Sequence, residues 1–110
     1  MNEITHYLIA DGHDPFQAWL EKVKKKDLPA SMRVLTRINR LAAGNAGDVK
    51  SVGEGVFELR ITYGPGYRVY YAYIDNKLVM LLAGGTKQRQ SADIEQAKAF
   101  LADYRKRVER

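Results

Sequence analysis

Residues 55–87 constrain the fold of this chain more than any other segment. Their sequence, GVFELRITYGPGYRVYYAYIDNKLVMLLAGGTK, contains three runs rich in β-forming residues, separated by Gly-Pro-Gly at 64–66 and Asp-Asn at 75–76. Glycine, proline, aspartate and asparagine are the residues that form tight turns between strands. We therefore expect three consecutive antiparallel strands joined by two hairpin turns.

The first turn predicts a register, because side chains alternate between the two faces of a sheet. Centring the turn on Pro65 pairs Tyr63 with Tyr67, Ile61 with Val69, Leu59 with Tyr71 and Phe57 with Tyr73. These residues form one apolar face, to which the third strand is expected to add Leu78, Met80 and Leu82. The opposite face receives a smaller and more polar set: Glu58, Arg60, Thr62, Arg68, Tyr70 and Ala72.

Cations gather on this second face. The third strand ends in Gly-Gly-Thr at 84–86, which is expected to place Lys87 beside Arg68. Arg60, Arg68, Tyr70 and Lys87 should therefore converge on one concave surface. Guanidinium and ammonium groups suit an anionic ligand, phosphate above all. The alternative is an ordinary solvated sheet face, stabilised by cross-strand charge pairs.

A phosphate site of this kind would suit RNA cleavage by the adjacent 2′-hydroxyl. Cations would stabilise the charge that develops on the phosphorus oxygens, and a positioned acid and base would assist. Glu58, the only carboxylate expected on this face, is either a base or the ion-pair partner of Arg60, and we favour the ion pair. The residues expected to line an RNA-binding surface around the cluster are Lys50, Glu58, Tyr63, Arg89 and Gln90. For Lys50 the alternative is plain solvation, and for Arg89 and Gln90 it is capping of the last helix.

The segments that flank this three-stranded unit are predicted to form one N-terminal strand and three helices. Residues 4–9 read as a strand, and a helix follows Asp14 as its N-cap and runs to about Lys26. Leu28 and Pro29 should break it before a second helix that starts near Ala30 and ends at Gly44. The residues that this second helix is expected to bury are Val34, Leu35, Ile38 and Leu41.

A short strand is expected around residues 49–52, and Ser91 is expected to cap the last helix. The apolar stripe of that helix comprises Ile94, Ala97, Leu101, Tyr104 and Val108. The order β-α-α-β-β-β-β-α predicts an α+β fold of two layers, a mainly antiparallel sheet with helices packed on one face. The polar face would then be open to a ligand.

Length and composition narrow the class of protein further. The 110 residues suit a single domain spanning 1–110, and the formal net charge of +5 favours an acidic partner. The chain has no cysteine, which excludes disulfides and thiolate chemistry, and His6 and His13 lack the spacing of metal ligands. We see no signal peptide and no apolar run of about 18 residues. We therefore expect a cytoplasmic protein without a metal, a cofactor or a membrane.

Several short motifs together resemble a known family. They are Gly44-Asn45-x-Gly47-Asp48, Glu58-Leu59-Arg60, YGPGYRVY at 63–70 and Gly84-Gly85-x-Lys87, and Phe16-x-x-Trp19-Leu20 extends the similarity towards the N-terminus. The chain resembles the phage-derived Gp49-like, HigB-type addiction-module killer proteins of the RelE/ParE toxin superfamily. The resemblance spans nearly the whole chain and implies a compact RelE/ParE-like toxin fold.

The resemblance also implies a function. Such a protein is the toxin of a type II toxin–antitoxin system, and RelE-like members are metal-independent endoribonucleases that cut mRNA on the ribosome. The family's basic residues match Arg60, Arg68 and Lys87. The expected partners are the ribosome, mRNA and a cognate antitoxin, commonly a helix-turn-helix protein from the adjacent gene.

The chain departs from the family pattern at four positions. Some relatives carry two lysines where this chain has Val56 and Glu58, and a tyrosine early in the last helix where it has Ile94. Thr86 stands where the commonest form has an acidic residue. Tyr70, Tyr63 or Lys87 would have to take over as the acid. Two alternatives stay open, a ParE-like non-enzymatic inhibitor of DNA gyrase and a degenerate toxin retained for antitoxin binding and autoregulation.

Overall fold

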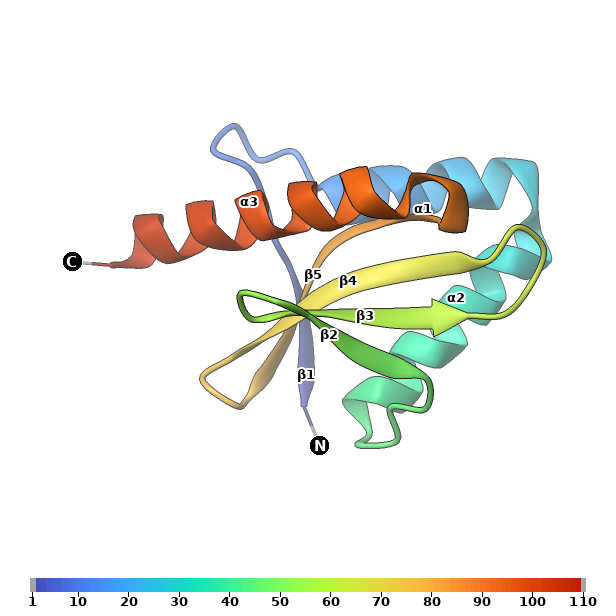
Figure 1. Cartoon of the computed structure of the whole chain (residues 1–110), viewed down its shortest axis with the longest axis horizontal. Coiled ribbons are helices and arrows are strands. Elements are labelled where there is room, and N and C mark those ends of the chain that lie inside the picture. The colour runs from blue at the N-terminus through green and yellow to red at the C-terminus, as the bar shows by residue number, and fades with distance from the viewer. Residues whose placement is uncertain (1, 110) are drawn as a thin grey trace.

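The computed structural model describes residues 2–109 and follows the predicted order of elements (Figure 1). The elements are β1 (Glu3–His6), α1 (Pro15–Lys26), α2 (Leu28–Ala42), β2 (Val49–Gly53), β3 (Val56–Ile61), β4 (Tyr67–Ile74), β5 (Leu78–Thr86), the short 3-10 helix η1 (Lys87–Arg89) and α3 (Gln90–Val108). Only η1 was not expected. None of the helices in residues 2–109 is long and apolar enough to cross a membrane.

The sheet has five strands in the order β1-β5-β4-β3-β2. All neighbours are antiparallel except β1, which runs parallel to β5. The mainly antiparallel sheet is therefore confirmed, and it is compatible with a RelE-like fold. β1 is shorter than the strand expected at 4–9, although the Tyr7 N–H still donates to the Leu81 carbonyl at 3.0 Å.

The predicted register of the β3–β4 hairpin is wrong by two residues. Ile61, rather than Tyr63, lies opposite Tyr67, and Arg60 lies opposite Arg68. The connection takes five residues, 62–66, and is closed by a hydrogen bond of 3.0 Å from the Gly66 N–H to the Tyr63 carbonyl. Because the shift is an even number of residues, each side chain stays on its predicted face.

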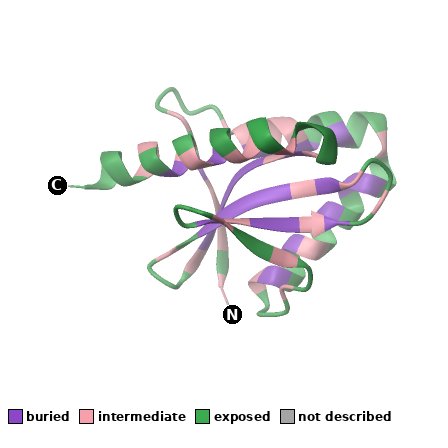
Figure 2. Ribbon diagram, in the orientation of Figure 1, coloured by how far each residue is buried: buried purple, intermediate pink, exposed green. Residues whose placement is uncertain are grey.

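Both faces of the sheet are covered by helices, whereas the sequence predicted all helices on one face. α1 and α2 pack on one face, where Leu59, Val69 and Tyr71 meet Phe16 and Val34. α3 packs on the opposite face; Figure 1 shows it crossing in front of the sheet, with α1 and α2 behind. The central strands are accordingly buried (Figure 2). The α+β class is confirmed, but the layers are helix, sheet and helix.

The third strand of the predicted unit explains this difference. The turn between β4 and β5 takes three residues, 75–77, rather than the expected two, so Tyr73 lies opposite Val79 and Tyr71 lies opposite Leu81. Val79 and Leu81 consequently join the core under α1 and α2. The side chains expected there, Met80 and Leu82, point to the other face and form a second core with Tyr70, Ala72, Ala97 and Leu101. That apolar surface is what α3 covers.

The helix ends follow simple capping rules. The Asp14 carboxylate accepts from the Gln17 N–H at 2.9 Å, as predicted, and its other oxygen bonds the His6 ring at 2.7 Å. Asp27 ends α1 and also caps α2 through the Ala30 N–H at 3.1 Å, so α2 begins at Leu28, before the predicted start. Pro29 lies in the first turn of α2, where a helix needs no N–H donor.

Three details of the predicted helices are wrong. Leu35 of α2 is 40% exposed and Val108 of α3 is 56% exposed, so neither is part of the core. Ser91 does not cap α3, because η1 leads directly into a helix that begins at Gln90 without a side-chain cap. The remaining stripe of α3, including Ile94 and Leu101, packs as expected.

Candidate functional site

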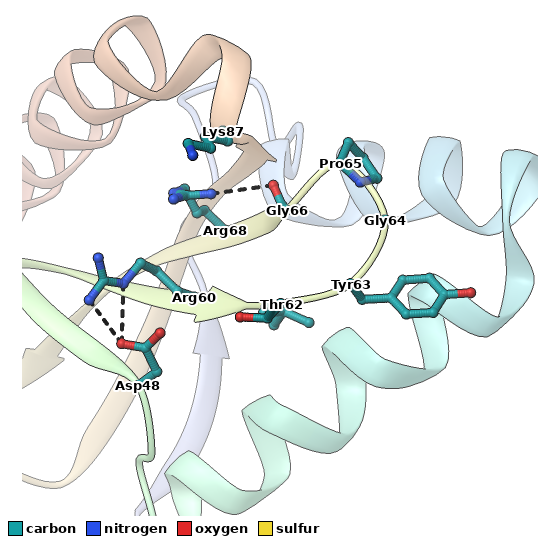
Figure 3. A pocket seen from close by; sticks show the side chains of 10 residues that line it. Asp48, Arg60, Thr62, Tyr63, Gly64, Pro65, Gly66, Arg68 and Lys87 are labelled. Atoms are coloured by element: carbon teal, nitrogen blue, oxygen red, sulfur yellow. Dashed lines mark hydrogen bonds and ion pairs between the residues drawn. The ribbon is translucent and has the colours of Figure 1, made fainter.

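A cleft of about 470 Å³ opens beside the turn between β3 and β4 (Figure 3). Its lining residues are Asp48, Arg60, Ile61, Thr62, Tyr63, Gly64, Pro65, Gly66, Arg68 and Lys87. Three of the four residues predicted to converge, Arg60, Arg68 and Lys87, therefore line one cavity. The charged lining comprises three cations and one carboxylate, an arrangement that suits an anionic ligand.

The sheet sets the order of these charged groups. Asp48 directly precedes β2, Arg60 lies on β3, Arg68 on β4, and Lys87 directly follows β5. Because the strands follow one another as β5-β4-β3-β2, the four residues form a row with Lys87 at one end and Asp48 at the other. Figure 3 shows the two arginines between them. The Lys87 N–H also donates to the Gly66 carbonyl at 2.9 Å, which ties the start of η1 to the hairpin turn.

Arg60 is held by Asp48, a residue that was not predicted to belong to the site. The Asp48 Oδ1 accepts from the Arg60 Nη2 at 2.9 Å and from the Nε at 3.2 Å. The side chains are 35% and 51% exposed, so both remain within reach of a ligand. The predicted ion pair between Arg60 and Glu58 is therefore wrong. The only sequence signal for Asp48 was its place in the Gly47-Asp48 motif.

Glu58 instead lies beneath Arg68, completely buried. Its Oε2 is 3.6 Å from the Arg68 Nε and accepts from the Gln90 amide at 2.8 Å and the Tyr70 hydroxyl at 3.2 Å. The Arg68 side chain is only 11% exposed, and its Nη1 donates to the Gly66 carbonyl at 3.4 Å. Glu58 thus supports Arg68 from below and does not contact the cleft.

Tyr70 is the predicted catalytic residue that the structure does not place in the cleft. Its side chain is fully buried and its hydroxyl donates to Glu58. Burial, reinforced by the nearby Glu58 carboxylate, raises the pKa of Tyr70 well above the usual 10.0. The predicted role of stacking on a base or orienting a 2′-hydroxyl is therefore wrong for this geometry, and Tyr70 is a structural neighbour of Glu58.

The remaining RNA-binding candidates are dispersed. Tyr63 lines the cleft, but Figure 3 shows its ring turned away from the cations, and the Arg33 guanidinium lies 4.5 Å from its centroid. Lys50 is exposed on the edge strand β2, opposite Glu58 in register, and Arg89 is exposed on η1. Gln90 is engaged with Glu58. The cleft is not lined by Lys50, Arg89 or Gln90.

The candidate general acid and the arrangement of potential metal ligands can also be compared with the sequence predictions. Ile94, at the position where some relatives carry a tyrosine, packs against the core under α3. Within residues 2–109, no group of three or more His, Cys, Asp or Glu side chains is arranged to hold a metal ion. Lys87 is exposed, and its ammonium has no hydrogen-bond or ion-pair partner in that same range, so it is available to a ligand.

The fold and the cleft define a class: a small α+β protein that presents a row of cations beside a hairpin turn. The family model described as "Phage derived protein Gp49-like (DUF891)" matches residues 18–107. The chain therefore belongs to this Gp49-like family, which is associated with the toxins of toxin–antitoxin systems.

A protein from Haemophilus influenzae, described as uncharacterized, is similar to this chain. The two are 52% identical over 83 residues, which cover 76% of this chain and 82% of the relative. The similarity carries no functional assignment of its own.

Proposed function

We propose that this chain is a HigB-type toxin of the RelE/ParE superfamily that acts as a ribosome-dependent, metal-independent mRNA endoribonuclease. The observation that carries the proposal is the row of Arg60, Arg68 and Lys87 in one cleft. A phosphodiester is the anion that such a row fits best, since two guanidinium groups can each donate two hydrogen bonds to its oxygens. The family's association with toxins supports the same conclusion.

In the proposed reaction, the 2′-oxygen of one nucleotide attacks the adjacent phosphorus while the bond from phosphorus to the 5′-oxygen breaks. Negative charge builds up on the two non-bridging oxygens, where Arg60 and Arg68 stabilise it more strongly than in the ground state. The products are a 2′,3′-cyclic phosphate, which can open to a 3′-phosphate, and a 5′-hydroxyl.

The ends of the row suit the two proton transfers. In-line attack places the entering and leaving oxygens on opposite sides of the phosphorus, and Asp48 and Lys87 lie on opposite sides of the arginine pair. Lys87 would donate a proton to the leaving 5′-oxygen, and the Asp48 oxygen that does not bond Arg60 would accept the proton of the 2′-hydroxyl. Asp48 thereby replaces Glu58 as the candidate base.

The direct test uses purified protein, programmed bacterial ribosomes and a defined mRNA. We expect cuts within the codon on the ribosome, with 5′-hydroxyl ends, and a loss of at least about 100-fold in the Arg60→Ala variant, checked for native circular dichroism. Wild-type protein that cuts the message neither with nor without ribosomes would overturn the proposal.

The alternatives would show other signs. A gyrase inhibitor would give stalled gyrase–DNA complexes and a DNA damage response without new RNA ends. A degenerate toxin would leave both RNA and growth unaffected. Neither function needs cations in a cleft, which is why the ribonuclease proposal is preferred.

A further inference from the structure

Helix α2 carries a second apolar stripe on the side that faces away from the sheet. Its inner residues, Ala30, Val34, Ile38 and Leu41, are buried in the core. Leu28, Met32 and Leu35 are 52%, 57% and 40% exposed, and their spacing of four and three residues places them on one outer face. These three are half of the large hydrophobic residues exposed in residues 2–109, whose others are Leu8, Tyr73 and Val108.

A basic groove runs alongside this stripe. It has a volume of about 510 Å³ and lies between α2 and the end of β3. Its lining residues are Met32, Arg33, Thr36, Arg37, Arg40, Asp48, Arg60, Ile61 and Thr62. Four arginines against one aspartate make the groove strongly positive, and Met32 belongs to both the groove and the apolar stripe.

The arginines from α2 line the groove without carboxylate partners in residues 2–109. Arg37 donates to the carbonyls of Arg60 at 2.7 Å and Ala46 at 3.1 Å, so it forms part of the groove wall. Arg33 stacks on the Tyr63 ring, and Arg40 is exposed. None of the three forms an ion pair within the described range 2–109.

We propose that the outer face of α2 is the docking site for an acidic amphipathic helix of a protein partner. Apolar side chains of that helix would cover Leu28, Met32 and Leu35, and its carboxylates would lie over Arg33 and Arg40. RNA fits this surface less well, because single-stranded RNA favours aromatic platforms with cations over exposed aliphatic side chains. The proposal rests on the proposed function, in which the partner is the antitoxin.

Docking here would also inhibit the cleft. The groove and the cleft share Asp48, Arg60, Ile61 and Thr62, so a helix in the groove lies at the edge of the cleft. A carboxylate of the partner that reaches Arg60 would compete with the scissile phosphate for the same guanidinium. Partner binding and RNA binding should therefore exclude one another.

The test measures binding by isothermal titration calorimetry, with the protein encoded by the adjacent gene as the probe. Met32→Asp should weaken binding at least about tenfold, because it places a carboxylate in an apolar contact that faces an acidic partner. Arg40→Glu should also weaken binding and should reduce its dependence on salt. Leu8→Asp, which changes an exposed leucine outside the groove, is the matched control and should stay within about twofold of wild type.

Three results would overturn the proposal: no complex with the wild-type chain, wild-type affinity for Met32→Asp, or loss of ribosome binding with Arg40→Glu while partner binding is retained. The last would assign the groove to RNA. Calorimetry does not depend on RNA cleavage. A chain that binds its partner through α2 but cuts no RNA would therefore contradict only the ribonuclease proposal and leave the docking proposal intact. Met32→Asp should itself cut RNA at the wild-type rate and escape neutralisation by the partner.

Discussion

Lys87 is the residue whose contribution to the cleft can be isolated most cleanly. It is exposed and its ammonium has no partner in residues 2–109, so Lys87→Ala should change the free energy of unfolding by less than about 0.5 kcal/mol. If Lys87 protonates the leaving oxygen, the single-turnover rate of RNA cleavage should fall by at least about 100-fold. Lys25→Ala, on the exposed end of α1, is the control. Equal cleavage rates for both variants would remove Lys87 from the mechanism.

Glu58 is a stability residue rather than an acid or base in contact with substrate. Its carboxylate has three neighbours, the Arg68 guanidinium, the Tyr70 hydroxyl and the Gln90 amide, and no contact with solvent. Glu58→Ala should lower the free energy of unfolding by about 3–5 kcal/mol, because it leaves the Arg68 guanidinium, which is only 11% exposed, without its carboxylate. Urea denaturation measures this, with Glu95→Ala on the exposed surface of α3 as control. A loss below about 1 kcal/mol would show that Arg68 does not depend on Glu58.

Asp93 gives a dependence of stability on pH. Burial raises the pKa of this carboxyl above the usual 3.8, against an opposing effect of Arg89, and its Oδ2 has no hydrogen-bond partner. The folded state therefore holds the proton more tightly than the unfolded state, and stability falls as the pH rises from 3.8 through the raised pKa.

Asp93→Asn removes this titration. The variant should be more stable than the wild type at neutral pH, and the difference should shrink as the pH falls towards 3.8. Urea unfolding of both proteins at a series of pH values measures the difference. A constant difference across the range would mean that Asp93 titrates alike in both states.

At the scale of elements, local signals were sufficient for most boundaries. The Asp14 cap, the Gly-Pro-Gly turn and the paired turn residues Asp75 and Asn76, both with positive φ, identified α1 and both hairpins. The register failed because a turn of five residues and one of three have the same turn signal, and only the loop length differs. Each side chain of this hairpin stayed on its predicted face because the register error was an even number of residues.

The placement of α3 was missed because β5 does not alternate. Residues 78–83 are apolar throughout, which is typical of a strand buried on both faces and gives no sign of which side chains point where. The turn between β4 and β5 is one residue longer than expected, and this odd shift exchanges the two sets of side chains. The face that carries Arg60 and Arg68 was predicted to be open to solvent. In the structure Tyr70, Met80 and Leu82 form an apolar area on that same face, and α3 packs on it.

Gly84 of β5 lies directly against the Trp19 ring of α1. A Cβ at this position would lie 2.1 Å from a ring carbon of Trp19, which is fixed between Phe16 and Tyr67. Gly84→Ala should therefore lower the free energy of unfolding by about 1–3 kcal/mol. Gly85→Ala is the comparison, because its Cβ would first meet the end of the Asp93 side chain, which can rotate. Wild-type thermal stability of Gly84→Ala would contradict this packing.

For the molecule as a whole, the sequence predicted the cations of the cleft better than their partners. Arg60, Arg68 and Lys87 line one cleft, as predicted. The order of the strands and the alternation of side chains along them were enough to predict this. Asp48 was missed because it belongs to a loop, where spacing carries no directional information. Tyr70 was assigned to the cleft because the alternation of side chains along a strand shows which face a residue lies on but not how deeply it is buried. In the structure α3 buries that part of the face.

The most direct test of the central claim is transcriptome-wide mapping of new RNA 5′ ends after brief expression of the chain in a bacterial host. Cells expressing an Arg68→Ala variant at equal protein level serve as the control. We expect new 5′-hydroxyl ends at fixed positions within the codons of translated messages, absent from the control. Growth arrest without new ends, or the same ends in the control, would contradict a ribonuclease built on this cleft.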